Sequence, residues 1–314
     1  MSFPEIQIGD DLLDYQMVVS VQVTQELNQH WRCAIACRQT EDQQIPIENY
    51  IGKPIEIRTV DGRGIECIHF SGFIQKVNLK YEIQGSYTAQ LLAVSSSYLM
   101  DVAPRKQNYT GKTLSSIVGT MAGRAGLVAD MKADNSKVFN CVQDNETDFF
   151  LLNRLIGNHG CWLRANADGI EVAESFQSGS TVEWRGEDGL IDFRIDGELV
   201  STIFNCSQPE YYSSVEWLTG PVQSASKMLQ EAGRSVSGMI TATGHSRSQT
   251  LMAGNTVEID GNISAKGTYG LIKVEHRWEG RGYTNFFVCT PWKNYCNPQP
   301  KKDESDERVI FQEA

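Results

Sequence analysis

The sequence of 314 residues predicts a mainly β protein of the α+β class, in which two antiparallel β-barrels flank an α/β module. Three observations support this fold. Apolar and polar residues alternate along residues 15–100, apolar residues take helical spacing within 102–190, and residues 191–292 repeat short motifs of the first region. We therefore expect domains at 1–101, 102–190 and 191–292, followed by a C-terminal tail at 293–314.

The first region contains five segments with the period-2 alternation of half-buried strands. Each of the first two segments places its apolar residues on one face: Val19, Val21 and Val23, then Trp31, Cys33, Ile35 and Cys37. Three further segments lie at 55–57, 73–81 and 87–93. Five strands within roughly 80 residues indicate an antiparallel barrel or a sandwich.

The middle region combines helices with strands. Thr110–Thr113 precedes apolar residues at helical spacing, namely Leu114, Ile117, Val118 and Met121. The string Thr-Gly-Lys-Thr invites a phosphate-loop interpretation, but that motif needs a glycine where Lys106 stands, so a helix start is favoured. Asp144–Asp148 places acidic residues at the start of a second helix, and Asn166–Gly169 predicts a hairpin turn.

The third region repeats three motifs of the first in the same order. The pairs are Gly52–Ile57 with Gly254–Ile259, Gly72–Val77 with Gly270–Val274, and Ser86–Thr88 with Gly282–Thr284. Such short strings can recur by chance in β proteins, but their common order favours a duplicated barrel whose matched strands superpose. A helical excursion near 216–237 is expected to interrupt this second barrel.

Composition excludes several classes of protein. The chain has 28 basic and 39 acidic residues, a net charge of −11, which disfavours sequence-specific binding of nucleic acid. No stretch approaches the ~20 apolar residues of a membrane span, and residues 1–8 lack the features of a secretory signal peptide. The eight cysteines are spread along the chain, so we expect reduced, buried thiols in a reducing cytosol rather than disulfides.

The sequence offers no recognisable catalytic or metal-binding constellation. It has no Cys-x-x-Cys pair and no Gly-x-Ser-x-Gly motif, and its five histidines are dispersed. His69 near Cys67 and His159 near Cys161 could be ligands only if folding joined them, and core or surface roles are favoured. Abundant acidic residues leave a carboxylate pair for sugar hydrolysis open. We predict no catalytic, cofactor-binding or metal-binding residues, and a structural protein rather than an enzyme.

A family resemblance emerges in the last strand region. Tyr269–His276, followed by Gly282–Phe287 and then Thr290–Trp292, resembles the hub region of contractile-tail spike proteins. That family includes VgrG of type VI secretion and the late control protein D and baseplate hub proteins of phages. The residues at the family's characteristic positions here are His276, Tyr283, Asn285, Phe287 and Pro291. Further segments resembling the family, in its order, are Tyr50–Pro54, Phe70–Ile74, Ser86–Leu91, Asp148–Leu155, Gly160–Trp162 and Leu251–Gly254.

The resemblance covers roughly residues 10–295 and implies a homotrimer with two tube-like barrels per subunit. It implies an adaptor between the sixfold tail tube and the threefold spike. The expected partners are a tail tube hexamer, baseplate wedge or tube-initiator proteins, and a separate spike with an oligonucleotide-fold domain and a β-helix. Alternatively, the sequence belongs to a longer protein that carries its own spike.

The implied place of action is a phage tail or a contractile injection particle, assembled from protein made in the bacterial cytoplasm without membrane insertion of this chain. Two alternatives remain open. One is a tail-associated peptidoglycan hydrolase, which would clear cell-wall suspensions. The other is a monomeric carbohydrate-binding β module with an exposed aromatic groove. Two interpretations of the tail are open: a frayed end, or a tether whose Val309–Phe311 adds to the sheet edge of a neighbouring hub subunit or of the spike.

Overall fold

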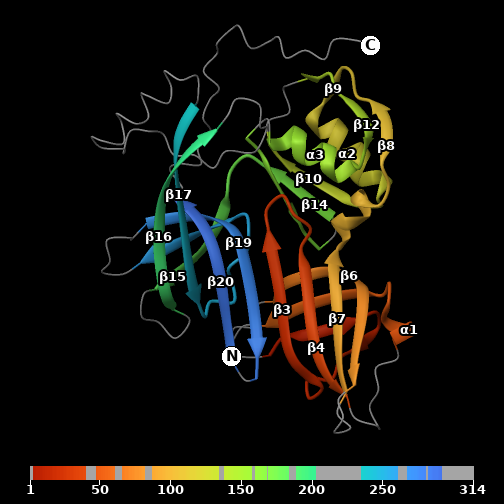
Figure 1. The fold of residues 1–314 in the computed structure, drawn as a ribbon, viewed down its shortest axis with the longest axis vertical. Coiled ribbons are helices and arrows are strands. Elements are labelled where there is room, and N and C mark those ends of the chain that lie inside the picture. Colours follow the sequence, from red (N-terminus) through yellow and green to blue (C-terminus); the bar gives the residue numbers. More distant parts are fainter. Residues whose placement is uncertain are drawn as a thin grey trace.

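The computed structural model describes residues 3–39, 47–60, 66–81, 87–133, 138–157, 160–167, 169–183, 189–202, 235–260, 267–280 and 282–291. Figure 1 shows two sheet halves side by side, with a smaller α/β module above them. Thirteen of the described strands form one continuous sheet that includes both halves. The mainly β fold expected from the sequence is confirmed.

The first half of the sheet has the strand order β3-β4-β7-β6-β5-β1-β2, with antiparallel neighbours throughout. Its strands are β1 (Glu5–Ile8), β2 (Asp11–Leu12), β3 (Val18–Glu26), β4 (Arg32–Gln39), β5 (Pro54–Val60), β6 (Glu66–Tyr81) and β7 (Tyr87–Ser95). A single-turn helix, α1 (Ile47–Tyr50), precedes β5, and a 3-10 helix, η1 (Ser96–Asp101), leads from β7 into the middle module.

The middle module packs two helices against three small sheets. Its strands are β8 (Arg105–Asn108), β9 (Lys112–Thr113), β10 (Val128–Lys132), β11 (Val138–Phe139), β12 (Val142–Glu146), β13 (Trp162–Ala165) and β14 (Gly169–Ala173), and its helices are α2 (Leu114–Arg124) and α3 (Asp148–Gly157). The expected helix start is confirmed, since the Thr113 hydroxyl accepts the amide of Ser116 at 3.3 Å and caps α2. The hairpin expected at Asn166–Gly169 joins β13 to β14.

The second half has the order β16-β17-β20-β19-β18-β15. Its strands are β15 (Gln177–Glu183), β16 (Leu190–Thr202), β17 (Ser235–Ser246), β18 (Asn255–Asp260), β19 (Gly267–Glu279) and β20 (Gly282–Pro291). The expected boundary at residue 190 therefore needs correction, because β15 pairs with β18 in parallel and joins this sheet. Its alternation is weak, with four of seven residues exposed, and so gave no clear strand signal.

The two halves share one topology. The strand order β3-β4-β7-β6-β5 of the first half matches, strand for strand, the order β16-β17-β20-β19-β18 of the second half. Both halves carry a β-bulge in the first of these strands, at Val19 and Ile191, and another in the long strand, at Gln75 and Ile272. Bulges are specific local features, so their coincidence supports duplication of an ancestral unit.

Two of the three matched motifs occupy equivalent places. Gly52 and Gly254 both have positive φ, 81° and 88°, and both donate their amide to the long strand, at Ile74 and Leu271, at 2.8 Å. Val77 pairs with Leu91, and the aligned Val274 pairs with Phe287. Tyr87 and Tyr283 each lie four residues before these partners, so they are equivalent.

The remaining match, Gly72–Val77 with Gly270–Val274, is wrong by one residue at its glycine. Gly72 lies opposite Ile55, whereas Gly270 lies opposite Thr256, the equivalent of Pro54. The bulges at Gln75 and Ile272 align. Gly72 lies three residues before its bulge, whereas Gly270 lies two residues before its own, so the two glycines are not equivalent. Lys76 and Val77 therefore remain equivalent to Lys273 and Val274, while Gly72 is equivalent to Tyr269.

Each half curls around its own apolar core. In the first half, Ile6 of β1 and Ile57 of β5 share one cluster with Val23 of β3 and Ile35 of β4. The second half encloses Leu271, Val274, Phe287 and Cys289, and the middle module has a separate core between its helices and sheets. In each half, strands from the two ends of the sheet therefore pack against the same core.

Several other expectations can now be compared with the structure. Val19 does not share the buried face of Val21 and Val23: the bulge turns it outward, and it is 39% exposed. All six described cysteines are free thiols, as expected, and burial raises the pKa of Cys37 to about 12. β17 begins at Ser235, so residues 235–237 of the helical excursion expected at 216–237 form a strand instead. Residues 216–234 and the tail at 293–314 lie outside the described residues.

Candidate functional site: the joint between the sheet halves

A strand pair joins the two halves of the sheet. Ser20–Glu26 of β3 pairs antiparallel with Lys273–Glu279 of β19, and Figure 1 shows these strands at the centre of the sheet. Polar side chains on this strand pair also meet across the joint: the Gln22 amide donates to the Glu275 carboxylate at 2.7 Å, and the Lys273 ammonium lies 3.7 Å from the Glu26 carboxylate. A continuous backbone ladder therefore links the halves.

A buried polar cluster lies in the second half at this joint. The Tyr283 hydroxyl donates to the Ser248 carbonyl at 3.1 Å and lies 2.6 Å from Nδ1 of His276. The Asn285 amide donates to the same carbonyl at 2.6 Å and to the Tyr283 hydroxyl at 3.1 Å. Because the hydroxyl has one proton, the tautomer with a proton on Nδ1 satisfies all these groups. These bonds to the Ser248 carbonyl hold the turn at Ser248 against β19 and β20.

The first half contributes a second buried histidine to the joint. The ring of His69 lies edge-on to that of His276, with centroids 4.7 Å apart, and its Nε2 is 2.7 Å from the Thr59 hydroxyl. Burial lowers the pKa of His69 to about 4. Burial, with a smaller effect of His69, holds the pKa of His276 well below its ordinary value. Both imidazoles are therefore neutral at pH 7.

Gln25 of β3 ties both halves together from a fully buried position. Its amide nitrogen donates to the carbonyl of His69 at 2.7 Å, and its oxygen accepts the amide of Ala253 at 3.2 Å. Sequence reasoning missed this residue. Its signal is a polar side chain at the third place of the apolar face begun by Val21 and Val23, where a buried amide needs partners.

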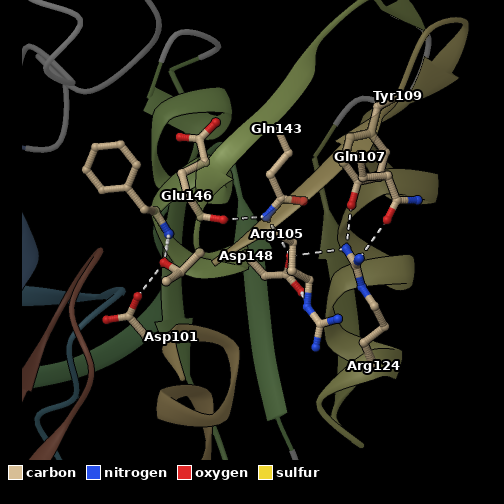
Figure 2. A network of polar contacts seen from close by, with 10 residues as sticks. Asp101, Arg105, Gln107, Tyr109, Arg124, Gln143, Glu146 and Asp148 are labelled. Carbon is tan, nitrogen blue, oxygen red and sulfur yellow. Dashed lines mark hydrogen bonds and ion pairs between the residues drawn. The ribbon is translucent and has the colours of Figure 1, made fainter. Parts of the chain in front are cut away.

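A second buried network holds the middle module together around Asp148, the first residue of α3 (Figure 2). Its carboxylate accepts from the Gln143 amide at 2.8 Å and from Arg124 at 3.1 Å. Arg124 also donates to Gln107 at 2.6 Å and to the Tyr109 hydroxyl. The network therefore connects α3 with β12, α2 and β8, and its negative charge lies at the positive end of the helix.

Both networks are suited to holding elements in place rather than to reacting with a substrate. Most of their donors and acceptors are bonded to one another in buried surroundings, although Nε2 of His276, Nε of Arg124 and Oε1 of Gln143 have no hydrogen-bond partner among the described residues. In the part of the chain that the structure describes, no three His, Cys, Asp or Glu side chains gather as metal ligands would. His69 contacts Thr59, and the Cys67 sulfur faces the Gln249 carbonyl at 3.9 Å. His159 lies outside the described residues.

A groove of about 720 Å³ lies between the sheet and the middle module. Its aromatic lining consists of Tyr98, Phe149 and Phe150. The ring of His30 stacks on that of Phe149, with centroids 3.7 Å apart. Burial lowers the pKa of His30, although nearby Asp101 opposes the shift.

The described geometry defines a duplicated β protein with an inserted α/β module, and solved tail proteins share this fold. The Escherichia coli type VI secretion component c3393, described as similar to the phage T4 tail proteins gp27 and gp5, aligns with a TM-score of 0.66 and 15% identity over 94% of this chain and 78% of its own. The 43 kDa tail protein of prophage MuSo2 from Shewanella oneidensis aligns with a TM-score of 0.66 and 11% identity over 92% and 98% of the two chains.

A tail protein from Neisseria meningitidis MC58 also aligns, with a TM-score of 0.64 and 12% identity over 93% of this chain and 97% of its own. No sequence family and no curated protein matches the chain. The expected resemblance to contractile-tail baseplate hubs is confirmed at the level of the fold. Of the described helices, none is long and apolar enough to cross a membrane.

Proposed function

We propose that the chain is a structural baseplate hub of a contractile injection machine, a trimeric adaptor between a sixfold tail tube and a threefold spike. The observation that carries the proposal is the internal duplication, with matching strand order and bulges. Three chains with two similar halves present six similar units, which suit a sixfold tube on one side and a threefold spike on the other.

The solved tail proteins support the same role. One is named as a component of type VI secretion, and others as phage tail proteins. A further neighbour is a PdpA–VgrG complex, which aligns with a TM-score of 0.57 at 8% identity. The proposed partners are accordingly a tail tube hexamer, a separate spike protein, and wedge or tube-initiator proteins. The net charge of −11 suits a hub whose wall repels acidic cargo.

The experiment is to assemble particles from the native locus with and without this chain. We expect particles to contain three copies between tube and spike, seen by electron microscopy, and the deleted locus to yield no tubes joined to spikes. Normal particles without the chain would refute the proposal. Clearing of a cell-wall suspension by the purified chain would instead favour the hydrolase alternative.

A further inference from the structure

The groove between the sheet and the middle module combines an outward sheet face with exposed aromatic rings. On one side lies the face of β3 and β4 that points away from the core, where Thr24 pairs with Arg32. On the other side lies the first turn of α3, where Phe150 is 62% exposed, together with the partly buried Tyr98. Large rings left in water beside a groove of about 720 Å³ indicate a surface that binds a partner.

The charges of the lining indicate what that partner carries. Asp101 is already matched, since its carboxylate accepts the Thr147 hydroxyl and lies 3.6 Å from Nε2 of His30. Arg32 is not matched: among the described residues, none forms an ion pair or a side-chain hydrogen bond with its guanidinium. An acidic segment with large apolar residues therefore complements both Arg32 and the aromatic rings.

The chain itself contains such a segment. Residues 303–314, which lie outside the described residues, have four acidic residues before Arg308 and the apolar trio Val309–Phe311 after it. A segment of the same chain is present at a high effective concentration, so even a weak fit is sufficient to fill the groove.

The end of β20 is close enough for this segment to reach the groove. β20 ends at Pro291, opposite Tyr269 of β19. The Ile272 carbonyl, three residues further along β19, accepts the amide of Leu27, which directly follows β3 beside the groove. Pro291 is thus at the same end of the sheet and two strands from β3, about 10 Å at the usual strand spacing. Residues 292–302 span up to about 36 Å when extended.

We propose that the groove binds residues 303–314 of the same chain. The acidic residues of the segment lie beside Arg32, and Val309–Phe311 packs against the Phe150 ring. Binding removes this ring from water and supplies the Arg32 guanidinium with an acceptor. The contact forms within one chain, with or without the adaptor trimer, so its absence would leave the proposed function standing.

Limited digestion of the full chain with trypsin tests this contact. Trypsin cuts after Arg308, inside the segment, and after Lys302, before it. Mass spectrometry follows the initial rate of each cut. Because the bound segment shields Arg308 in the parent, Phe150→Ala and Arg32→Glu should each speed the cut after Arg308 by about fivefold and leave the cut after Lys302 unchanged.

The matched controls are Leu99→Ala and Arg38→Glu. Leu99 is 45% exposed and lies outside the groove lining, and Arg38 is an exposed residue of β4 that also lies outside it. Both controls should keep the parent's rates. Since the four changed side chains are partly or fully exposed, all four variants should keep the parent's circular dichroism spectrum.

A second measurement uses a synthetic peptide of residues 303–314. It is titrated into the parent and into the full chain carrying Ile310→Asp and Phe311→Asp, whose own segment should no longer bind. The peptide should bind this double variant about tenfold more tightly than the parent, in which the groove is already filled. A peptide of scrambled sequence should bind neither chain.

Each contrary outcome overturns the proposal in a recognisable way. Equal rates of cutting after Arg308 in the parent and in both groove variants would show that the segment lies elsewhere. Equal peptide affinity for the parent and the double variant would show that the groove is empty in the parent. Protection of Arg308 that disappears on dilution would place the segment in the groove of a second copy and overturn binding within one chain.

Discussion

Acid should loosen the joint between the sheet halves, because its two buried histidines resist protonation. The pKa of His69 in the folded chain is about 4, below the 6.5 of an exposed imidazole. The unfolded chain therefore takes up the proton first as the pH falls. The stabilisation is complete above pH 6.5 and is lost between pH 6.5 and about 4. For His69 alone the loss is about 2 kcal/mol at pH 5 and about 3 kcal/mol below pH 4.

The assay is urea unfolding of the full chain at pH 7 and pH 5, for the parent and for His69→Gln. Gln keeps a nitrogen or oxygen within reach of the Thr59 hydroxyl but carries no titrating ring. We expect this variant to lose about 2 kcal/mol less than the parent between the two pH values. Gln90→Ala, which changes an exposed side chain of β7 and removes no titrating group, is the control and should keep the parent's acid loss. An equal loss in His69→Gln and in the parent would refute the reasoning.

Two further substitutions test the turn geometry and the middle module. Gly254→Ala should destabilise the chain by about 1 kcal/mol more than Gly52→Ala, since both glycines have positive φ but only at Gly254 would a Cβ stand 3.0 Å from the Trp162 ring; equal unfolding midpoints for the two variants would contradict this. Asp148→Asn should cost about 2 kcal/mol, because Arg124 loses its charged acceptor, and hydrogen exchange should show faster opening confined to the middle module; an unchanged exchange pattern would count against a holding role for this network.

Local patterning was sufficient to predict five strands of the first half (β3 to β7), the hairpin of β13 and β14, and both helices of the middle module, but it missed β1, β2, β8 to β12 and β15. Ile35, Cys37 and Leu91 are buried on the faces that alternation predicts, and Leu114 and Ile117 lie on the buried side of α2. Such patterns work where one face meets a core and the other meets solvent. They fail at bulges: one extra residue reverses the alternation, which is why Val19 is exposed. The mismatch of Gly72 with Gly270 has a different origin, because the bulges align and Tyr269 occupies the place of Gly72.

The joint could be predicted only in part. The resemblance singled out His276, Tyr283 and Asn285, but their common hydrogen-bond cluster depends on the turn at Ser248, 28 residues before His276 in the chain. The partnership of His276 with His69 depends on pairing between two halves far apart in sequence. Contacts of this kind leave no local periodicity, so only the fold brings them together.

The joint within the chain can hold buried polar groups for a physical reason. The strands β3 and β19 never separate in the folded state, so the amide of Gln25 keeps its bonds to the His69 carbonyl and the Ala253 amide. At a surface that must be exposed before assembly, a polar side chain bonded to water would lose those bonds on association. In the proposed adaptor trimer, duplication within one chain also halves the number of associations needed for a six-unit ring, since three of its six joints form during folding.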